Sequence, residues 1–177
     1  IDENTEMNMY KNGELDWAGD PTGGIPLDAI QSLKDDGSLI VEPKTGVYYY
    51  AFNVEEEPMN NVNIRKALAL AINRTGIAEK ITKTEEIPAM ALVPTAIWEE
   101  NESGYFEDEN IEQAKEYLEK GLEELGYSSA EELPPITLSY NTDEGHANIA
   151  QAVQDMWKKN LGIEVTLENS EWKVYLD

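Results

Sequence analysis

The most constraining feature of the sequence is a strand, helix and strand pattern in its last third. Apolar residues alternate in residues 136–140 (ITLSY) and again in residues 163–168 (IEVTLE), which is the period of a half-buried β-strand. Residues 145–161 between them have helical spacing, and Gly162 can end that helix. The apolar face of this helix comprises Ile149, Ala152, Val153, Met156 and Trp157. Two strands joined in this way predict a βαβ unit with a parallel pair and a right-handed crossover.

The rest of the sequence predicts four more helices and three more strands. Asn61 or Asn63 is placed to cap one helix, and Asn110 with Gln113 resembles the capping box of another. The expected helices are residues 4–12, 26–37, 63–74 and 110–126, and the expected strands are residues 14–19, 38–42 and 46–54. We therefore expect an α/β fold for residues 1–177, forming a single lobe with a mixed sheet and flanking helices.

Charge and composition exclude several classes of function. The chain of 177 residues has a formal net charge of −23 and a pI of about 4.2, so it repels phosphate and makes nucleic acid and anionic membranes poor partners. It has no cysteine, which excludes disulfides and cysteine-ligated metals. No apolar run approaches the roughly 18 residues of a spanning helix.

The two ends of the sequence favour a piece cut from a longer protein. The chain begins at Ile1 and stops in EWKVYLD without a polar tail.

A candidate site follows the first strand of the βαβ unit. The segment NTDEGH, residues 141–146, contains the only histidine of the chain, His146, together with Asn141. Ligands of open α/β sheets bind beyond the carboxyl ends of the strands, which is where this segment falls. Trp172 comes shortly after the second strand and emerges on the same edge if the two strands are parallel. The topology thus predicts an amide, an imidazole and an indole at one edge.

These groups suit a small anion next to an apolar side chain. The first turn of the helix offers free N–H groups and a partial positive charge, to which His146 adds a titratable cation. Asn141 both donates and accepts hydrogen bonds, and Trp172 suits an apolar or aromatic group. Asp143 and Glu144 favour the start of the helix, so we interpret them as capping residues.

Other interpretations of this segment stay open on the residues alone. Thr142 or Ser139 would have to be the nucleophile of a catalytic triad, but the sequence has no Gly-x-Ser-x-Gly elbow. A metal site needs three or four converging ligands, and the chain has no second histidine. A lone histidine near a helix start is also commonly a capping or solvated residue. We expect no catalytic residue, no metal and no cofactor.

Two blocks of the sequence resemble the oligopeptide-binding proteins that feed ABC importers, which are family 5 extracellular solute-binding proteins. They are NVNIRKALALAINRTGI (residues 61–77) and LSYNTDEGHANIAQAVQDMWKKNLGIEVTLENSEWKVYLD (residues 138–177). The resemblance implies a bilobal periplasmic-binding-protein fold that closes around an extended peptide without performing chemistry. It also implies that this chain is most of the C-terminal lobe, and that the other lobe lies outside it.

The resemblance assigns roles to three residues. Asn141 and His146 match positions near the C-terminal end of the bound peptide, where the histidine helps to hold the carboxylate of shorter peptides. Trp172 matches a tryptophan that lines a side-chain pocket. Some family members carry a lysine just after FN, whereas this chain continues as FNVEEEP with three glutamates at residues 55–57. This departure puts the preferred peptide length and charge in doubt and favours basic peptides.

The implied partners are short peptides and, through the full-length protein, the membrane permease of the importer. The implied location is extracytoplasmic, as a cell-surface lipoprotein or in the periplasm, and we expect the isolated chain to be a monomer. The same scaffold serves other ligands in related proteins, so a signalling peptide, a nickel chelate or haem is the alternative solute.

Overall fold

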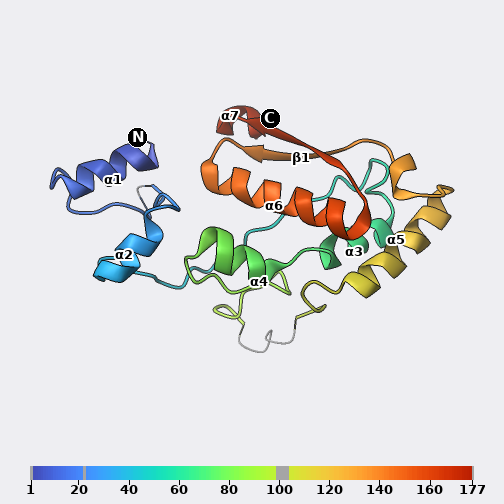
Figure 1. Cartoon of the computed structure of the whole chain (residues 1–177), viewed down its shortest axis with the longest axis horizontal. Coiled ribbons are helices and arrows are strands. Elements are labelled where there is room, and N and C mark those ends of the chain that lie inside the picture. Colours follow the sequence, from blue (N-terminus) through green and yellow to red (C-terminus); the bar gives the residue numbers. More distant parts are fainter. Residues whose placement is uncertain (1, 22, 99–103, 177) are drawn as a thin grey trace.

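The computed structural model describes residues 2–21, 23–98 and 104–176 (Figure 1). Its elements in chain order are α1 (Glu3–Lys11), α2 (Ile30–Asp36), α3 (Val62–Leu70), α4 (Arg74–Ile77), the π-helical turn η1 (Ala78–Thr82), α5 (Ile111–Leu125), the 3-10 turn η3 (Ala130–Glu132), β1 (Ile136–Asn141), α6 (Glu144–Leu161), β2 (Val165–Ser170) and α7 (Trp172–Tyr175).

The strand, helix and strand unit forms as the sequence predicts. β1 and β2 pair in parallel, with Ile136 opposite Val165 and Asn141 opposite Ser170. α6 runs between them in the sequence and packs along the pair (Figure 1). The carboxyl ends of both strands and the first turn of α6 therefore lie at the same edge, which is the geometry that the candidate site requires.

Local signals set both ends of α6. Asp143 accepts a hydrogen bond from the backbone N–H of His146 at 2.9 Å, so its role as a helix cap is confirmed. Gly162 has φ = +70°, a left-handed conformation that glycine adopts without strain, and it ends the helix. The buried face of α6 is centred on Val153 and Trp157, and the indole N–H of Trp157 donates to the carbonyl of Leu68 at 2.9 Å. This bond satisfies the polar group of a buried aromatic ring.

α3 and α5 pack closely against each other and complete the main core. Asn61 caps α3 by accepting from the backbone N–H groups of residues 63 and 64, and Asn110 caps α5. A Cβ atom added to Gly121 would lie 2.7 Å from Cδ1 of the fully buried Ile64, so the two helix backbones approach to a distance that needs glycine. The principal core residues are Ile64, Ala67, Leu68, Ala71, Ala114, Leu118, Val153, Trp157 and Ile163.

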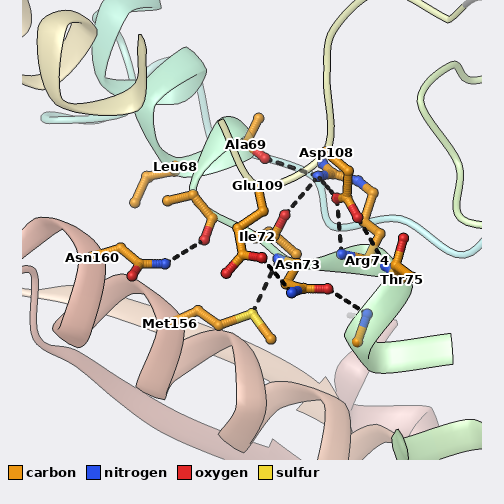
Figure 2. Close-up of polar contacts among 12 residues, drawn as sticks. Leu68, Ala69, Ile72, Asn73, Arg74, Thr75, Asp108, Glu109, Met156 and Asn160 are labelled. Carbon is orange, nitrogen blue, oxygen red and sulfur yellow. Dashed lines mark hydrogen bonds and ion pairs between the residues drawn. The ribbon is translucent and has the colours of Figure 1, made fainter. Parts of the chain in front are cut away.

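The single helix predicted for residues 63–74 is wrong at its end, because α3 stops at Leu70 and α4 begins at Arg74. Polar side chains hydrogen-bond to the backbone at this break. Asn73 has an extended backbone and is the N-cap of α4, because its side chain accepts a hydrogen bond from the backbone N–H of Gly76. Asp108 accepts from the backbone N–H groups of Arg74 and Thr75, each at 2.9 Å. Figure 2 shows the Arg74 guanidinium directed at the carbonyl of Ala69, to which it donates at 3.0 Å. These side chains provide hydrogen-bond partners for the backbone N–H and C=O groups that are left unpaired where one helix ends and the next begins.

α1 and α2 form a separate small cluster at one end of the molecule (Figure 1). Met7, Ala29 and Leu33 are its buried apolar residues, and they do not belong to the main core. The helix predicted for residues 4–12 is confirmed, whereas the helix predicted from residue 26 begins only at Ile30, after a turn.

The three strands predicted for residues 14–19, 38–42 and 46–54 are wrong in this structure. In the described part of the chain the sheet has two strands only, and these segments are turns or unpaired extended backbone. A strand needs a hydrogen-bonding neighbour, and in the described ranges no strand pairs with these segments. Residues of the segment 49–53 instead line a groove of about 380 Å³ together with Thr137, Leu138 and Ser139 of β1 and with Tyr175.

Candidate functional site

The carboxyl edge of the parallel pair holds the predicted site residues. Asn141 ends β1 opposite Ser170, and the pairing continues one step further because the backbone N–H of Thr142 donates to the carbonyl of Ser170 at 2.8 Å. The first turn of α6 contains His146, and α7 begins with Trp172 directly after β2. Figure 1 shows α7, the tip of β1 and the first turn of α6 at the same end of the unit.

His146 has a partner that the sequence did not predict. Its Nδ1 lies 3.1 Å from the hydroxyl of Tyr48, a residue 98 positions earlier in the chain. The two rings are also in contact, with their centroids 5.4 Å apart and their planes tilted by 32°. Tyr48 in turn makes a T-shaped contact with Tyr50, with the ring centroids 5.7 Å apart and the ring planes at 82°. The alternating run YYY does place Tyr48 and Tyr50 on one face, but nothing in the sequence indicates that this face meets α6.

Three carboxylates surround the first turn of α6. Asp143 accepts from the backbone N–H of residue 146, and Glu144 lies in the first turn, where it complements the helix dipole. Burial raises the pKa of Glu3, and the negative charges of Asp143 and Glu144 raise it further. The first turn of α6 is thus already engaged by a carboxylate of the protein, and its surroundings are acidic.

Trp172 presents its indole to solvent. The side chain is 55% exposed and stacks on Tyr175 with ring centroids 6.1 Å apart. Asn141 and His146 are half-buried. In the described chain, no hydrogen bond or ring contact joins any two of these three residues. They share an edge of the sheet without contacting one another.

The geometry does not assemble the catalytic or metal alternatives. The Nδ1 of His146 contacts a phenol, and neither Ser139 nor Thr142 hydrogen-bonds to the imidazole. Among the residues described, no group of three or more histidine, aspartate or glutamate side chains is arranged to hold a metal ion. Within the same residues, the helices are too short or too polar to cross a membrane.

Solved structures identify the class of fold. The murein tripeptide-binding protein MppA of Escherichia coli aligns with 99% of this chain and 34% of its own, with a TM-score of 0.79 and 33% identity. The Haemophilus influenzae OppA, solved in complex with the peptide RPPGFSPFR, aligns with 99% of this chain and 35% of its own, with a TM-score of 0.74 and 34% identity. The α/β lobe is thus part of a periplasmic-binding-protein fold.

The family follows from the sequence as a whole. Residues 1–177 match the bacterial extracellular solute-binding proteins, family 5 Middle, and the chain belongs to this family. The oligopeptide-binding protein OppA of Bacillus subtilis is 57% identical over 176 residues, which cover 98% of this chain and 32% of that protein. The chain spans about a third of the length of the curated relatives that it matches.

Proposed function

We propose that this chain is part of the peptide-capturing component of an ABC importer, and we call the complete protein the parent. The observation that carries the proposal is the carboxyl edge of the parallel pair, where the exposed indole of Trp172 and the half-buried imidazole of His146 both lie. Relatives named as oligopeptide-binding and dipeptide-binding proteins, 57% and 37% identical, support the same ligand class. The parent binds and delivers short peptides and performs no chemistry on them.

Each predicted residue has a role in this proposal. His146 and Asn141 contact the peptide near its C-terminal end, where the imidazole helps to hold the carboxylate. Trp172 packs against a peptide side chain, for which its exposed indole is suited. The remaining contacts are to the peptide backbone and through water, so that the sequence preference is loose. The acidic groups around α6 and the glutamates at residues 55–57 favour peptides with basic side chains.

The chain is proposed to be most of the C-terminal lobe of the parent, with a sheet that other parts of the parent complete. The supporting observation is the groove between β1 and residues 49–53, because among the described residues β1 pairs with β2 only and residues 49–53 pair with no strand. A further strand fits such a gap, since it satisfies the hydrogen-bonding groups of both sides. Peptide binding then involves a hinge closure of this lobe on another one.

The location and partners of the parent follow from the same proposal. It works outside the cytoplasm, in the periplasm or as a lipoprotein at the cell surface, and it passes peptides to a membrane permease. The isolated chain is a monomer in this proposal, since its net charge of −23 opposes self-association.

A titration of the full-length parent tests the proposal directly. Tri- to octapeptides should release or absorb heat in a calorimeter and raise the melting temperature of the parent. Trp172→Ala should weaken binding, and Lys159→Ala, an exposed change near the other end of α6, serves as the control. Absence of both heat and a melting shift with every peptide would contradict the proposal.

A different solute on the same scaffold is the second candidate. The specific observation in its favour is a 34% identical relative named as a probable deoxycholate-binding periplasmic protein, which covers 98% of this chain. A signalling peptide, a nickel chelate and haem belong to the same alternative. Mass spectrometry of the ligand that copurifies with the parent separates these solutes from a mixture of short peptides.

A further inference from the structure

Tyr48 and His146 form a pair that restricts the orientation of the imidazole. One hydrogen bond at 3.1 Å and one ring contact at 5.4 Å join the two side chains. The edge of Tyr50 supports the Tyr48 ring from another side. The hydrogen bond and the ring contact both favour one orientation of the imidazole about its side-chain torsions.

The chemistry of the two groups selects one proton arrangement. A neutral imidazole has one N–H donor and one bare nitrogen acceptor, and the hydrogen bond at one nitrogen determines which form is present. A phenol hydroxyl is a better donor than an imidazole N–H, and a bare imidazole nitrogen is a better acceptor than a phenol oxygen. A phenol has an ordinary pKa of about 10, so the Tyr48 hydroxyl keeps its proton at neutral pH. The side chain is half exposed, and its partial burial raises this pKa further. The hydroxyl therefore donates to Nδ1, and Nε2 carries the hydrogen.

We infer that Tyr48 is a positioning residue, which holds His146 as the neutral tautomer with hydrogen on Nε2 so that this nitrogen donates to the peptide carboxylate. The inference rests on the proposed function, in which His146 contacts that carboxylate. In this tautomer the N–H group at Nε2 is a hydrogen-bond donor, which is the group that a carboxylate oxygen accepts from. Recognition of the carboxylate then needs no imidazolium, and the segment around residue 48 contributes to peptide specificity without touching the carboxylate.

The tautomer can be read directly in the full-length parent. A long-range proton–nitrogen correlation spectrum with labelled histidine reports which ring nitrogen is bare, and His146→Gln identifies the signals of this residue. We expect a bare Nδ1 in the wild type and a mixture of tautomers in Tyr48→Phe, which keeps the ring contact and removes only the hydroxyl. Tyr49→Phe, an equally small change on the exposed neighbouring side chain, should leave the spectrum unchanged.

Affinity measurements connect the tautomer to binding. Tyr48→Phe should weaken a tripeptide with a free carboxylate about three- to tenfold, the range that one net hydrogen bond provides. The affinity for the same peptide with an amidated C-terminus should change little. His146→Gln, whose amide can donate from a similar place to Nε2, should bind the free-carboxylate peptide more tightly than His146→Asn.

The outcomes separate this inference from the proposed function. A wild type with hydrogen on Nδ1, or a Tyr48→Phe variant with unchanged tautomer and unchanged discrimination between free and amidated peptides, overturns the inference while peptide binding stands. A parent that binds no peptide refutes the proposed function instead, and the spectrum still reports the tautomer in that case. Equal losses for free and amidated peptides would make Tyr48 a structural residue only, which also overturns the inference.

Discussion

The carboxylate of Glu6 lies buried against the loop that follows α1. Its side chain accepts the backbone N–H of Gly19 at 3.2 Å, and the residue is only 6% exposed. A Cβ atom on Gly23 would come within 2.4 Å of Oε2, so the loop backbone passes directly over the carboxylate. A buried acceptor among backbone groups fixes the loop that connects α1 to α2.

Glu6→Ala should therefore destabilise the protein by about 1–3 kcal/mol, since it leaves a buried backbone N–H without this acceptor. Urea unfolding measures the change as a shift of the transition midpoint. Glu14→Ala, which removes an exposed glutamate of the same region, is the matched control and should shift the midpoint little. Equal midpoints for the two variants would show that the buried carboxylate does not stabilise the loop.

At the scale of elements, α3 and α5 are joined by packing that leaves no room for a side chain at Gly121. Alanine normally favours a helix interior over glycine by about 1 kcal/mol. Here its methyl group would lie 2.7 Å from Cδ1 and 3.1 Å from the backbone nitrogen of Ile64, which is fully buried. Gly121→Ala should thus lower the free energy of unfolding by about 1–3 kcal/mol.

Thermal unfolding followed by circular dichroism checks this prediction. Lys120→Ala changes the adjacent exposed position of α5 and should leave the melting temperature nearly unchanged. A Gly121→Ala variant that melts at a higher temperature than the wild type would mean that helix propensity outweighs the close approach.

The same two helices are joined by one carboxylate whose pKa is lowered. Asn61 and Asn63 donate to Oε2 of Glu124 at 2.9 and 2.7 Å, and these hydrogen bonds lower the pKa of Glu124. A pKa that is lower in the folded state contributes stability above the ordinary glutamate value, about 4.3. That contribution is lost as the pH falls through the lowered folded value.

Glu124→Gln should consequently be less sensitive to acid than the wild type between about pH 5 and pH 3. Its amide oxygen still accepts from the two asparagines, but it cannot be protonated in this range. Melting temperatures measured across that range should converge as the pH falls. Parallel curves for the two proteins would contradict a role for the ionised carboxylate.

The elements that could be predicted from sequence are those whose causes are local. α6 and α5 were predicted because apolar periodicity, an Asx cap and a terminal glycine all lie within the element itself. The break after α3 was missed because Asp108, which takes the N–H groups of α4, lies far away in the sequence. The strand at residues 46–54 was predicted from its alternation, but pairing depends on a neighbouring strand that the described residues do not supply.

The site was predictable to a similar degree. The βαβ pattern alone places Asn141, His146 and Trp172 at one edge, because parallel strands end on the same side. The pairing of Tyr48 with His146 could not be predicted, since it depends on how the unpaired segment lies against α6. The peptide contacts of all three residues remain predictions.

At the scale of the whole molecule, the chain offers one wall of the proposed binding site. The groups proposed to contact peptide lie at a single edge and do not touch each other. Affinity for peptides depends on burial and on contacts from both sides of an extended chain. The isolated 177-residue chain should accordingly bind tripeptides at least a hundredfold more weakly than the parent, as calorimetry can measure. Sub-micromolar binding by the isolated chain would contradict the proposed division into lobes.

The separate packing of α1 and α2 has a consequence for motion. Their buried cluster is small and distinct from the main core, and a surface ion pair between Lys34 and Glu85 at 3.0 Å is a weak attachment. This end of the molecule should open more often than the βαβ unit, with faster amide hydrogen exchange. Because Glu3 belongs to α1 and its carboxylate interacts electrostatically with His146, we expect each opening of α1 to remove negative charge from the surroundings of His146. In the proposed function, the charge that an arriving peptide meets is then a time average, which depends on the local stability of α1.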